Sequence, residues 1–204
     1  DNYDGLEEVL QNFALQSHKI CIVTYDTVGA HYAEKVKTIA QKAAAYVCVF
    51  SFPAGESSKT LDVIEDLYEV LIKAHFDRKD ILLALGGGVV GDMTGYAAAT
   101  YLRGIRVIQL PTSLLAMVDS SIGGKTGVDF RGYKNMVGAF HPPSAVYMNV
   151  STLKTLTKEQ YFSGFGEIIK HGLIKDMNYF DTIQKNIMAL NDRDLSALAE
   201  IIYG

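Results

Sequence analysis

The sequence has few of the residues that mark extracellular or cysteine-based proteins. Only two of its 204 residues are cysteine, and four are proline. Cys21 and Cys48 lie in apolar, strand-like runs and have no C-x-x-C spacing, so they form neither a disulfide framework nor a cysteine-based zinc site. We interpret both as buried free thiols in a reducing compartment.

Long apolar runs and an excess of positive charge are also missing. No apolar run reaches the ~18 residues of a membrane span, and the acidic start DNYDGLEEVL has no signal-peptide character. The formal net charge of -4 argues against non-specific nucleic-acid binding. We therefore expect a cytoplasmic protein without a membrane or nucleic-acid partner, in which a local cluster of cations would have to hold any anionic ligand.

What the sequence does contain is the pattern of an α/β domain. Apolar residues make up 49% and charged residues 21%, which supports a substantial core and argues against disorder. Strand-like and helix-like segments alternate, which predicts parallel βαβ units in a Rossmann-like, parallel-rich sheet. The expected strands are 19–24, 46–50, 81–85, 105–110 and 145–150, and the expected helices are 6–15, 28–45, 60–75 and 89–101.

The stretch LGGGVVG, residues 85–91, follows the third of these strands and opens a helix. Bare backbone at a helix N-terminus can hold a phosphate on free N–H groups. The spacing Gly86-x-Gly88-x-x-Gly91 also fits the dinucleotide pattern in form, although a tight turn without a ligand would fit it too. The classical ribose-binding acid is absent from residues 109–112, so a standard Rossmann dehydrogenase is disfavoured.

A ribose would then need a partner from another loop. Glu56, with Lys59 near it, is a candidate in the loop 51–59, and a solvated helix N-terminus is the alternative interpretation of both residues. Ligands of open α/β sheets bind beyond the carboxyl ends of the strands. We therefore expect the loops 51–59, 86–92 and 111–135 to face one crevice.

The segment 119–135 is rich in glycine, serine and lysine and has no periodicity, which predicts a long functional loop. It carries Asp119, Lys125, Lys134 and Asn135, and Arg103 follows the helix before it. Several cations beside one carboxylate suit an anionic, hydroxylated substrate such as a sugar phosphate. A solvated charged loop is the alternative.

After residue 150 the chain becomes helical, with a capping-box pattern at 157–160 and expected helices over 158–175, 179–190 and 194–203. We expect an α/β domain over 1–150 and the start of an all-helical domain over 151–204. Glu167, Lys170 and His171 share one helix face. Glu167 and His171 could bind a divalent metal, and a Glu167–Lys170 salt bridge is the alternative.

Six stretches, taken together, resemble the 3-dehydroquinate synthase family and run in the family order. They cover most of the chain from about residue 50 to 175 and are far more specific than one glycine loop. They are GESSK (55–59), GGGVVGDMTGYAAATYLRG (86–104), QLPTSLLAMVDSSIGGKTGVD (109–129), KNMVGAF (134–140), STLKTL (151–156) and GEIIKHGLI (166–174).

The resemblance implies a phosphate-eliminating cyclase of the shikimate pathway, a carbon–oxygen lyase. Its substrate is 3-deoxy-D-arabino-heptulosonate 7-phosphate and its product is 3-dehydroquinate. The reaction passes through NAD+-dependent oxidation at C5, phosphate loss, re-reduction and aldol closure, with no net redox change. The implied cofactors are NAD+ and a divalent metal, Zn2+ or Co2+, and the implied assembly is a homodimer.

The resemblance also assigns residues. Glu167 matches a zinc ligand, whereas His171 does not, and Arg103 matches a phosphate contact that a neighbouring subunit can supply. Asp119, Lys125, Lys134 and Lys170 match the catalytic set, and together with Arg103 and Asn135 they match the substrate-binding set. The cofactor-binding matches are Glu56, Lys59, Gly87, Gly88, Val89, Val90, Gly91, Asp92, Thr112, Ser113, Lys125, Lys134, Thr152, Leu153, Lys154 and Thr155.

Two family features are not found in this sequence. The family's zinc-binding histidines belong to a motif later than Gly204, and its first strand precedes Asp1, so we expect the chain to be a fragment. The alternatives are a related sugar-phosphate cyclase or an NAD- and metal-dependent, glycerol-type alcohol dehydrogenase. A non-catalytic NAD-binding module is the third possibility.

Overall fold

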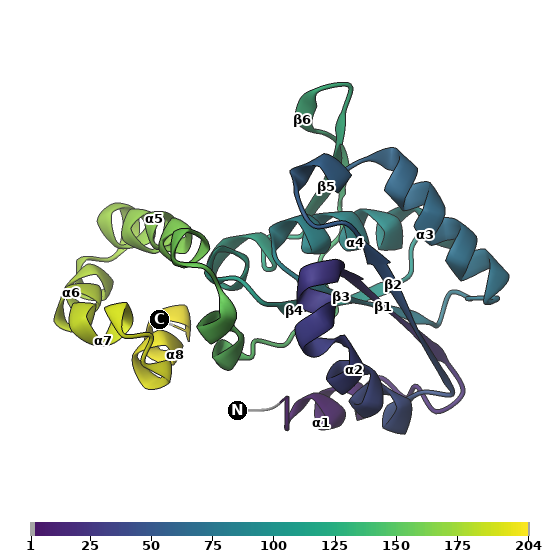
Figure 1. The fold of residues 1–204 in the computed structure, drawn as a ribbon, viewed down its shortest axis with the longest axis horizontal. Coiled ribbons are helices and arrows are strands. Elements are labelled where there is room, and N and C mark those ends of the chain that lie inside the picture. Colours follow the sequence, from purple (N-terminus) through teal and green to yellow (C-terminus); the bar gives the residue numbers. More distant parts are fainter. Residues whose placement is uncertain (1–2, 204) are drawn as a thin grey trace.

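The computed structural model describes residues 3–203 as a layered α/β part followed by a run of helices (Figure 1). Residues 1, 2 and 204, which belong to the expected domains, lie outside the described part. The main sheet has five parallel strands in the order β2-β1-β3-β4-β7. They are β1 (Lys19–Tyr25), β2 (Tyr46–Phe52), β3 (Ile81–Gly86), β4 (Arg106–Pro111) and β7 (Ala145–Val146). The predicted α/β class with a parallel sheet is confirmed.

Helices cover both faces of this sheet. They are α1 (Leu6–Gln11), α2 (Asp26–Ala43), α3 (Leu61–Lys73) and α4 (Gly88–Thr100), with short helical turns η1 (Glu56–Ser58), η2 (Tyr101–Arg103) and η3 (Ala116–Ser120). Alternate residues of β3 enter two different cores: Leu82 packs with α3 and α4, and Leu83 packs with α1 and α2. Since both faces of β3 are covered, every residue of this strand is buried, as its unbroken apolar run predicts.

The order of the strands decides where a ligand can bind. The connection from β1 leads to β2 on one side, and β3 then pairs with β1 on its other side. The order in which strands are added to the sheet therefore switches sides between β1 and β3, and the crevice beyond their carboxyl ends is the usual ligand site of such sheets. The glycine turn begins at the carboxyl end of β3.

The predicted long loop at 119–135 is wrong, because much of it forms an antiparallel hairpin. Strand β5 (Lys125–Phe130) pairs with β6 (Tyr133–Phe140), and this hairpin projects from the main body near α4 (Figure 1). The turn is Arg131-Gly132, both with positive φ, a two-residue connection that matches strand twist. Gly127 pairs with Gly138, and a Cβ on Gly138 would lie 2.1 Å from the Thr126 carbonyl oxygen. These glycines remove the apolar alternation that identifies a strand.

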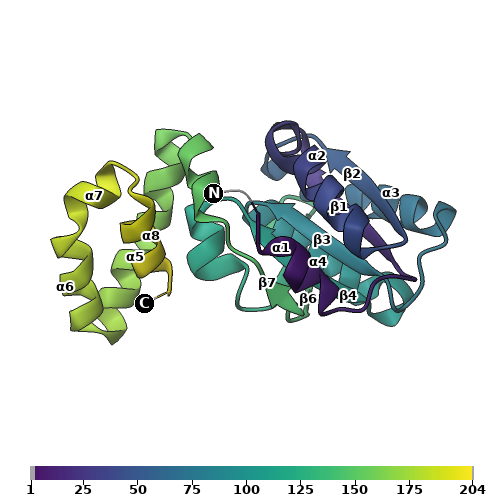
Figure 2. The same cartoon turned by 90° about the horizontal axis from the view of Figure 1, so that it is seen from below.

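The helical part comprises η4 (Val150–Thr155), α5 (Lys158–Lys175), α6 (Met177–Lys185), α7 (Ile187–Asn191) and α8 (Leu195–Tyr203), and it lies beside the sheet in both views (Figures 1 and 2). The helix expected at 179–190 is two helices that meet at Asn186. The last expected strand, 145–150, is only two residues long, because Val150 already begins η4. The division of the chain into domains at residue 150 stays a prediction.

The helical part has its own core, which also includes Leu114 and Met117 from the segment after β4. Helix α5 approaches that segment closely at Gly164, where a Cβ would lie 2.7 Å from the Leu114 side chain. This close contact fixes α5 against the end of the sheet that carries the glycine turn.

The helices within residues 3–203 are too short or too polar to cross a membrane. Cys21 is buried, as expected. Cys48, its partner in the β1–β2 register, is only partly buried because β2 is an edge strand.

Candidate functional site

The glycine turn is built for close approach by a ligand. Gly87 is the N-cap of α4 and offers no side chain to the first turn of the helix. A Cβ on Gly87 would lie 3.3 Å from the Ser113 hydroxyl, and one on Gly88 would lie 3.2 Å from the Ser120 hydroxyl. The turn therefore exposes backbone N–H groups between hydroxyls, at the positive end of the helix dipole.

A cavity of about 470 Å³ lies beside this turn, at the carboxyl ends of β1 and β3. Its lining is mostly backbone, hydroxyl and aromatic groups, and its residues come from the sheet, α2, η4 and α5. They are Tyr25, Thr27, Val28, His31, Tyr32, Ala54, Gly55, Gly87, Gly88, Val89, Thr112, Ser113, Leu115, Thr155, Leu156, Thr157, Gln160 and Ser163. We call it the glycine-turn cavity.

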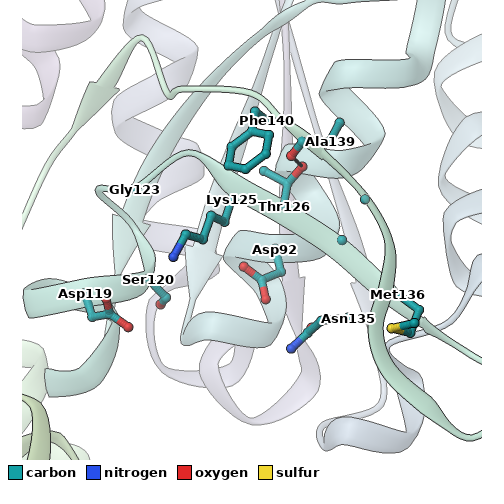
Figure 3. Close-up of a pocket in the computed structure, with 12 residues that line it drawn as sticks. Asp92, Asp119, Ser120, Gly123, Lys125, Thr126, Asn135, Met136, Ala139 and Phe140 are labelled. Atoms are coloured by element: carbon teal, nitrogen blue, oxygen red, sulfur yellow. Dashed lines mark hydrogen bonds between the residues drawn. The ribbon is translucent and has the colours of Figure 1, made fainter.

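A second cavity, of about 540 Å³, lies between α4, the segment after η3 and the hairpin. Figure 3 shows the charged and polar side chains of Asp92, Asp119, Lys125 and Asn135 gathered around this space. The remaining lining residues are Ser120, Gly123, Thr126, Gly127, Met136, Gly138, Ala139 and Phe140. We call it the hairpin cavity.

Lys59 joins the segments that form the hairpin cavity. Its side chain is almost completely buried, and its Nζ donates to Asp92 Oδ2 at 2.6 Å and to Asn135 Oδ1 at 2.5 Å. The backbone carbonyl of Lys59 also accepts a hydrogen bond from the Asp129 N–H at 2.8 Å. The loops 51–59, 86–92 and 111–135 therefore lie together as predicted, but they line two cavities and not one crevice. The alternative of a solvated helix N-terminus is wrong for Lys59.

Burial and the ion pair act on Asp92 in opposite directions. Burial raises the pKa of the Asp92 carboxyl and is the larger cause, whereas the hydrogen bond from Lys59 lowers it. The net result is a pKa above the usual value. Glu56, by contrast, is exposed and pairs with Lys134 at 3.2 Å on the surface of the hairpin.

Ser120 lies at the boundary between the two cavities, and sequence reasoning missed it. It lines the hairpin cavity, and its hydroxyl faces Gly88 of the glycine-turn cavity. This hydroxyl is buried and has no hydrogen-bond partner among the described residues. A buried donor without a partner is costly, so a hydroxyl that faces the bare glycine turn is a candidate ligand contact. The only sequence signal was its place next to Asp119.

The remaining cofactor-binding assignments fall into different environments. Val90 belongs to the sheet core, and Gly91 packs on Gln109, whose amide donates to the Gly91 carbonyl at 3.2 Å. Thr152 and Leu153 are buried, and Lys154 is exposed. Six of the assigned residues line the glycine-turn cavity, namely Gly87, Gly88, Val89, Thr112, Ser113 and Thr155.

Glu167 and Lys170 lie on α5, one turn apart, and line neither of these two cavities. The Glu167 carboxylate is paired with the Lys170 ammonium, and His171 Nε2 lies 3.8 Å from Glu167 Oε2. The Lys170 hydrogen bond is the main cause that lowers the pKa of Glu167. Glu167 is thus ionised and suited to a cation, but it offers one carboxylate only.

One other group of potential metal ligands exists within residues 3–203, formed by His18, Asp77 and Asp80. It lies at the amino ends of β1 and β3, opposite the glycine turn. Asp80 already accepts backbone N–H groups from Lys19 at 2.7 Å and Asp77 at 2.6 Å. Its carboxylate therefore stabilises the chain entering two strands.

Arg103 is exposed in the turn that follows α4. Leu102, Arg103 and Gly104 all have positive φ, a conformation that costs about 1–2 kcal/mol for each non-glycine residue. Arg78 Nε donates to the Leu102 carbonyl at 3.2 Å and helps to hold this turn. Arg103 lines neither of the two cavities of its own chain.

The comparisons with known proteins identify the family and the fold. A family model described as the 3-dehydroquinate synthase N-terminal region matches residues 49–163. A 3-dehydroquinate synthase of Ruminiclostridium cellulolyticum is 48% identical over 171 residues, which are 84% of this chain and 48% of that protein. The chain spans about half the length of the curated relatives it matches.

Two solved structures are similar in fold. ValA, a 2-epi-5-epi-valiolone synthase from Streptomyces hygroscopicus subsp. jinggangensis with NAD+ and Zn2+ bound, has a TM-score of 0.84 and 30% identity, over 92% of this chain and 53% of its own. A 2-deoxy-scyllo-inosose synthase with carbaglucose-6-phosphate, NAD+ and Co2+ has a TM-score of 0.76 and 26% identity, over 96% of this chain and 58% of its own. By the family model and the identity of its relatives, the chain belongs to the 3-dehydroquinate synthase family.

Proposed function

We propose that this chain forms the cofactor-binding part, and one metal ligand, of a 3-dehydroquinate synthase. The reaction converts 3-deoxy-D-arabino-heptulosonate 7-phosphate into 3-dehydroquinate and phosphate, so the enzyme is a carbon–oxygen lyase. The observation that carries the proposal is the pair of cavities that share the N-terminus of α4. One cavity is lined by backbone and hydroxyl groups and the other by charged side chains. The match of the chain to the 3-dehydroquinate synthase family supports the same function.

NAD+ fits the glycine-turn cavity. The bare turn at Gly87 and Gly88 offers N–H groups to a diphosphate, and a side chain there would crowd the Ser113 and Ser120 hydroxyls. Thr112 and Thr155 add hydroxyls along the wall. When bound, NAD+ would supply reversible hydride acceptance at the substrate's C5. The protein residues of this cavity hold and orient the cofactor.

The sugar phosphate fits the hairpin cavity. Lys125 and Asn135 offer donors to hydroxyl or phosphate oxygens, and Asp119 at the edge accepts from a hydroxyl. Lys134 lies exposed on the same hairpin and is paired with Glu56, so an anionic substrate would have to compete with that carboxylate for it. With the leaving phosphate acting as its own base, the task of these residues is positioning and electrostatic stabilisation. The likeness to a cyclase that binds carbaglucose-6-phosphate supports this class of substrate.

Glu167 is proposed as one ligand of a Zn2+ or Co2+ site, with Lys170 as a substrate contact. A metal there would supply a Lewis acid. One carboxylate does not complete such a site, because catalytic zinc takes three protein ligands, so further ligands are needed. Glu167→Ala should therefore abolish metal-dependent turnover of the complete protein and leave NAD+ binding intact. Retained turnover would disprove the ligand role.

Arg103 is proposed to contact the phosphate of a substrate bound by a neighbouring copy, which requires a homodimer. Its exposed, strained turn supports this role, because Arg103 lines neither cavity of its own chain. Light scattering of the complete protein tests it, and a monomer that turns over substrate at dilution would exclude it.

The decisive activity test is release of inorganic phosphate from the heptulosonate phosphate by the complete protein. We expect release that needs NAD+ in catalytic amounts and stops with a chelator. Steady accumulation of NADH would instead indicate an alcohol dehydrogenase, and NAD+ binding without either product would indicate a non-catalytic module. The likeness to ValA favours a second candidate function, that of another sugar-phosphate cyclase. Phosphate release from a different heptulose phosphate, with none from 3-deoxy-D-arabino-heptulosonate 7-phosphate, would identify it.

A further inference from the structure

The turn between the sheet and α5 forms one wall of the glycine-turn cavity. It consists of η4 and Leu156, and Thr155 and Leu156 both line the cavity. The Thr155 hydroxyl donates to the Thr152 carbonyl at 2.9 Å and lies 2.7 Å from the Tyr32 hydroxyl of α2. The position of this turn therefore sets the width of the cavity between α2 and α5.

A 3₁₀ turn of this kind ends with carbonyl groups that have few partners along the chain. Here the partner is the side chain of Arg193. Its Nη1 donates to the carbonyls of Leu153 at 2.9 Å, Lys154 at 3.2 Å and Leu156 at 2.8 Å. A single guanidinium nitrogen, about 40 residues further along the chain, thus gathers three carbonyls of the turn.

The guanidinium is itself held in place. Its Cζ lies 4.5 Å from the centre of the Tyr161 ring, a cation–π contact. Tyr161 is buried, and its hydroxyl donates to the Leu190 carbonyl at 2.6 Å. Arg193 also adopts φ of 56° between α7 and α8. Such a conformation is uncommon for a residue other than glycine, asparagine or aspartate, and persists where surrounding contacts determine it.

We propose that Arg193 is a positioning residue for the cofactor. It anchors the helical part to the turn 150–156 and thereby holds Thr155 and Leu156 at the wall of the glycine-turn cavity. The inference rests on the proposed binding of NAD+ in that cavity. Arg193 itself does not line the cavity, so it acts through the turn.

The test is NAD+ titration by calorimetry of the wild-type chain and of Arg193→Met, Arg193→Lys and a matched control. We expect Arg193→Met to raise the NAD+ dissociation constant about tenfold, because the charge-assisted hydrogen bonds that Nη1 shares among three carbonyls are lost. Arg193→Lys should fall between, since an ammonium keeps the charge but not the planar fork. The control is Arg106→Met. Arg106 also donates to backbone carbonyls, of Phe13 and Lys79, and stacks on Phe13.

Arg106 lies at the start of β4, far from the turn, so its loss should lower the melting temperature without changing NAD+ affinity by more than about twofold. A double-mutant cycle of Arg193→Lys with Thr155→Val should show a combined effect smaller than the sum. Equal affinity in Arg193→Met and the wild type would overturn the inference, as would additive effects of Arg193→Lys and Thr155→Val.

Hydrogen exchange separates this inference from the proposed function. In the absence of cofactor, Arg193→Lys should speed amide exchange at residues 150–156, while Arg106→Met should not. Unchanged exchange there would overturn the anchoring role even if NAD+ binds. If the wild type binds no NAD+ while Arg193→Lys still speeds exchange at residues 150–156, the proposed cofactor binding is wrong and the anchoring role of Arg193 is retained.

Discussion

The two cavities beside α4 are of similar size but recognise ligands by different means. The glycine-turn cavity, of about 470 Å³, exposes backbone, hydroxyls and aromatic rings. The hairpin cavity, of about 540 Å³, is lined by Asp92, Asp119, Lys125 and Asn135. Backbone donors are fixed by the fold, whereas charged side chains on a hairpin can adjust to a ligand. The difference suits a retained cofactor on one side and an exchanging substrate on the other.

The cavities are not independent, because both include residues of α4, and two side chains fix α4 or its surroundings. Lys59 holds Asp92 of the first helical turns to Asn135 of the hairpin. Ser120 lines the hairpin cavity and faces Gly88. Substitutions can therefore be chosen that damage both cavities, or one, or only a single contact.

Removing the shared anchor should have the largest effect. Lys59→Met leaves the partly buried Asp92 carboxylate without its cation, and losing one partner of such a pair costs about 3 kcal/mol. Urea denaturation should report this loss, and calorimetry should report weaker NAD+ binding as well. If Lys59→Met kept both the stability and the affinity of the wild type, the cavities would not share this anchor.

Disturbing the hairpin should damage one cavity only. The Cβ of Gly138→Ala would lie 2.1 Å from the Thr126 carbonyl oxygen, so β5 and β6 must separate, at a cost of about 2 kcal/mol typical of overpacking. We expect faster hydrogen exchange in the hairpin and unchanged NAD+ affinity. Gly123→Ala is the matched control, since a Cβ at Gly123 meets no atom within 4 Å. Loss of NAD+ binding in Gly138→Ala would contradict the separation of the cavities.

Ser120→Ala should have opposite effects on the free and the bound protein. The buried hydroxyl has no partner among the described residues, so its removal should leave the stability of the free chain unchanged or slightly raised. If the cofactor accepts from it, NAD+ affinity should fall about fivefold, as expected for a bond worth ~1 kcal/mol. Ser121→Ala, which removes another unpartnered hydroxyl outside both cavities, is the control. Equal NAD+ affinities of the two variants would remove Ser120 from the site.

The smallest expected effect is a pH dependence from Asp92. Its pKa is raised above the usual 3.8 mainly by burial. A raised pKa means that the folded chain holds the proton more tightly than the unfolded chain. The resulting stabilisation is complete below the usual pKa and is lost as the pH rises through the folded value. Carboxyl NMR titration should place the midpoint above 3.8, and Asp92→Asn should remove this part of the pH dependence. A midpoint at or below 3.8 would mean that the Lys59 ion pair outweighs burial.

Much of the fold was predictable because it follows from local patterns. The unbroken apolar run at Ile81–Gly86 requires cover on both faces, and three glycines before a helix produce the turn at Gly87. The same residues led to the prediction that this turn binds a phosphate. Family motifs then supplied the candidate residues, including Lys125 and Asn135 in the cavity that the structure reveals.

The hairpin and the anchors were not predictable from local patterns. Strands β5 and β6 pair through Gly127 and Gly138, and glycine carries no apolar signal. The burial of Lys59 depends on Asp92 and Asn135, which lie 33 and 76 residues away. Such contacts depend on tertiary packing, which a spacing rule does not contain.

By itself, then, the sequence determined a parallel α/β sheet with a bare glycine turn at the start of α4, because burial and backbone freedom act locally. Only the tertiary structure decided that this turn lies between two cavities. It also decided that Lys59 joins α4 to the hairpin and that Arg193 reaches back to the wall of the glycine-turn cavity. The physical reason is that a buried cation is stable only where several distant chain segments bring their oxygen atoms to it.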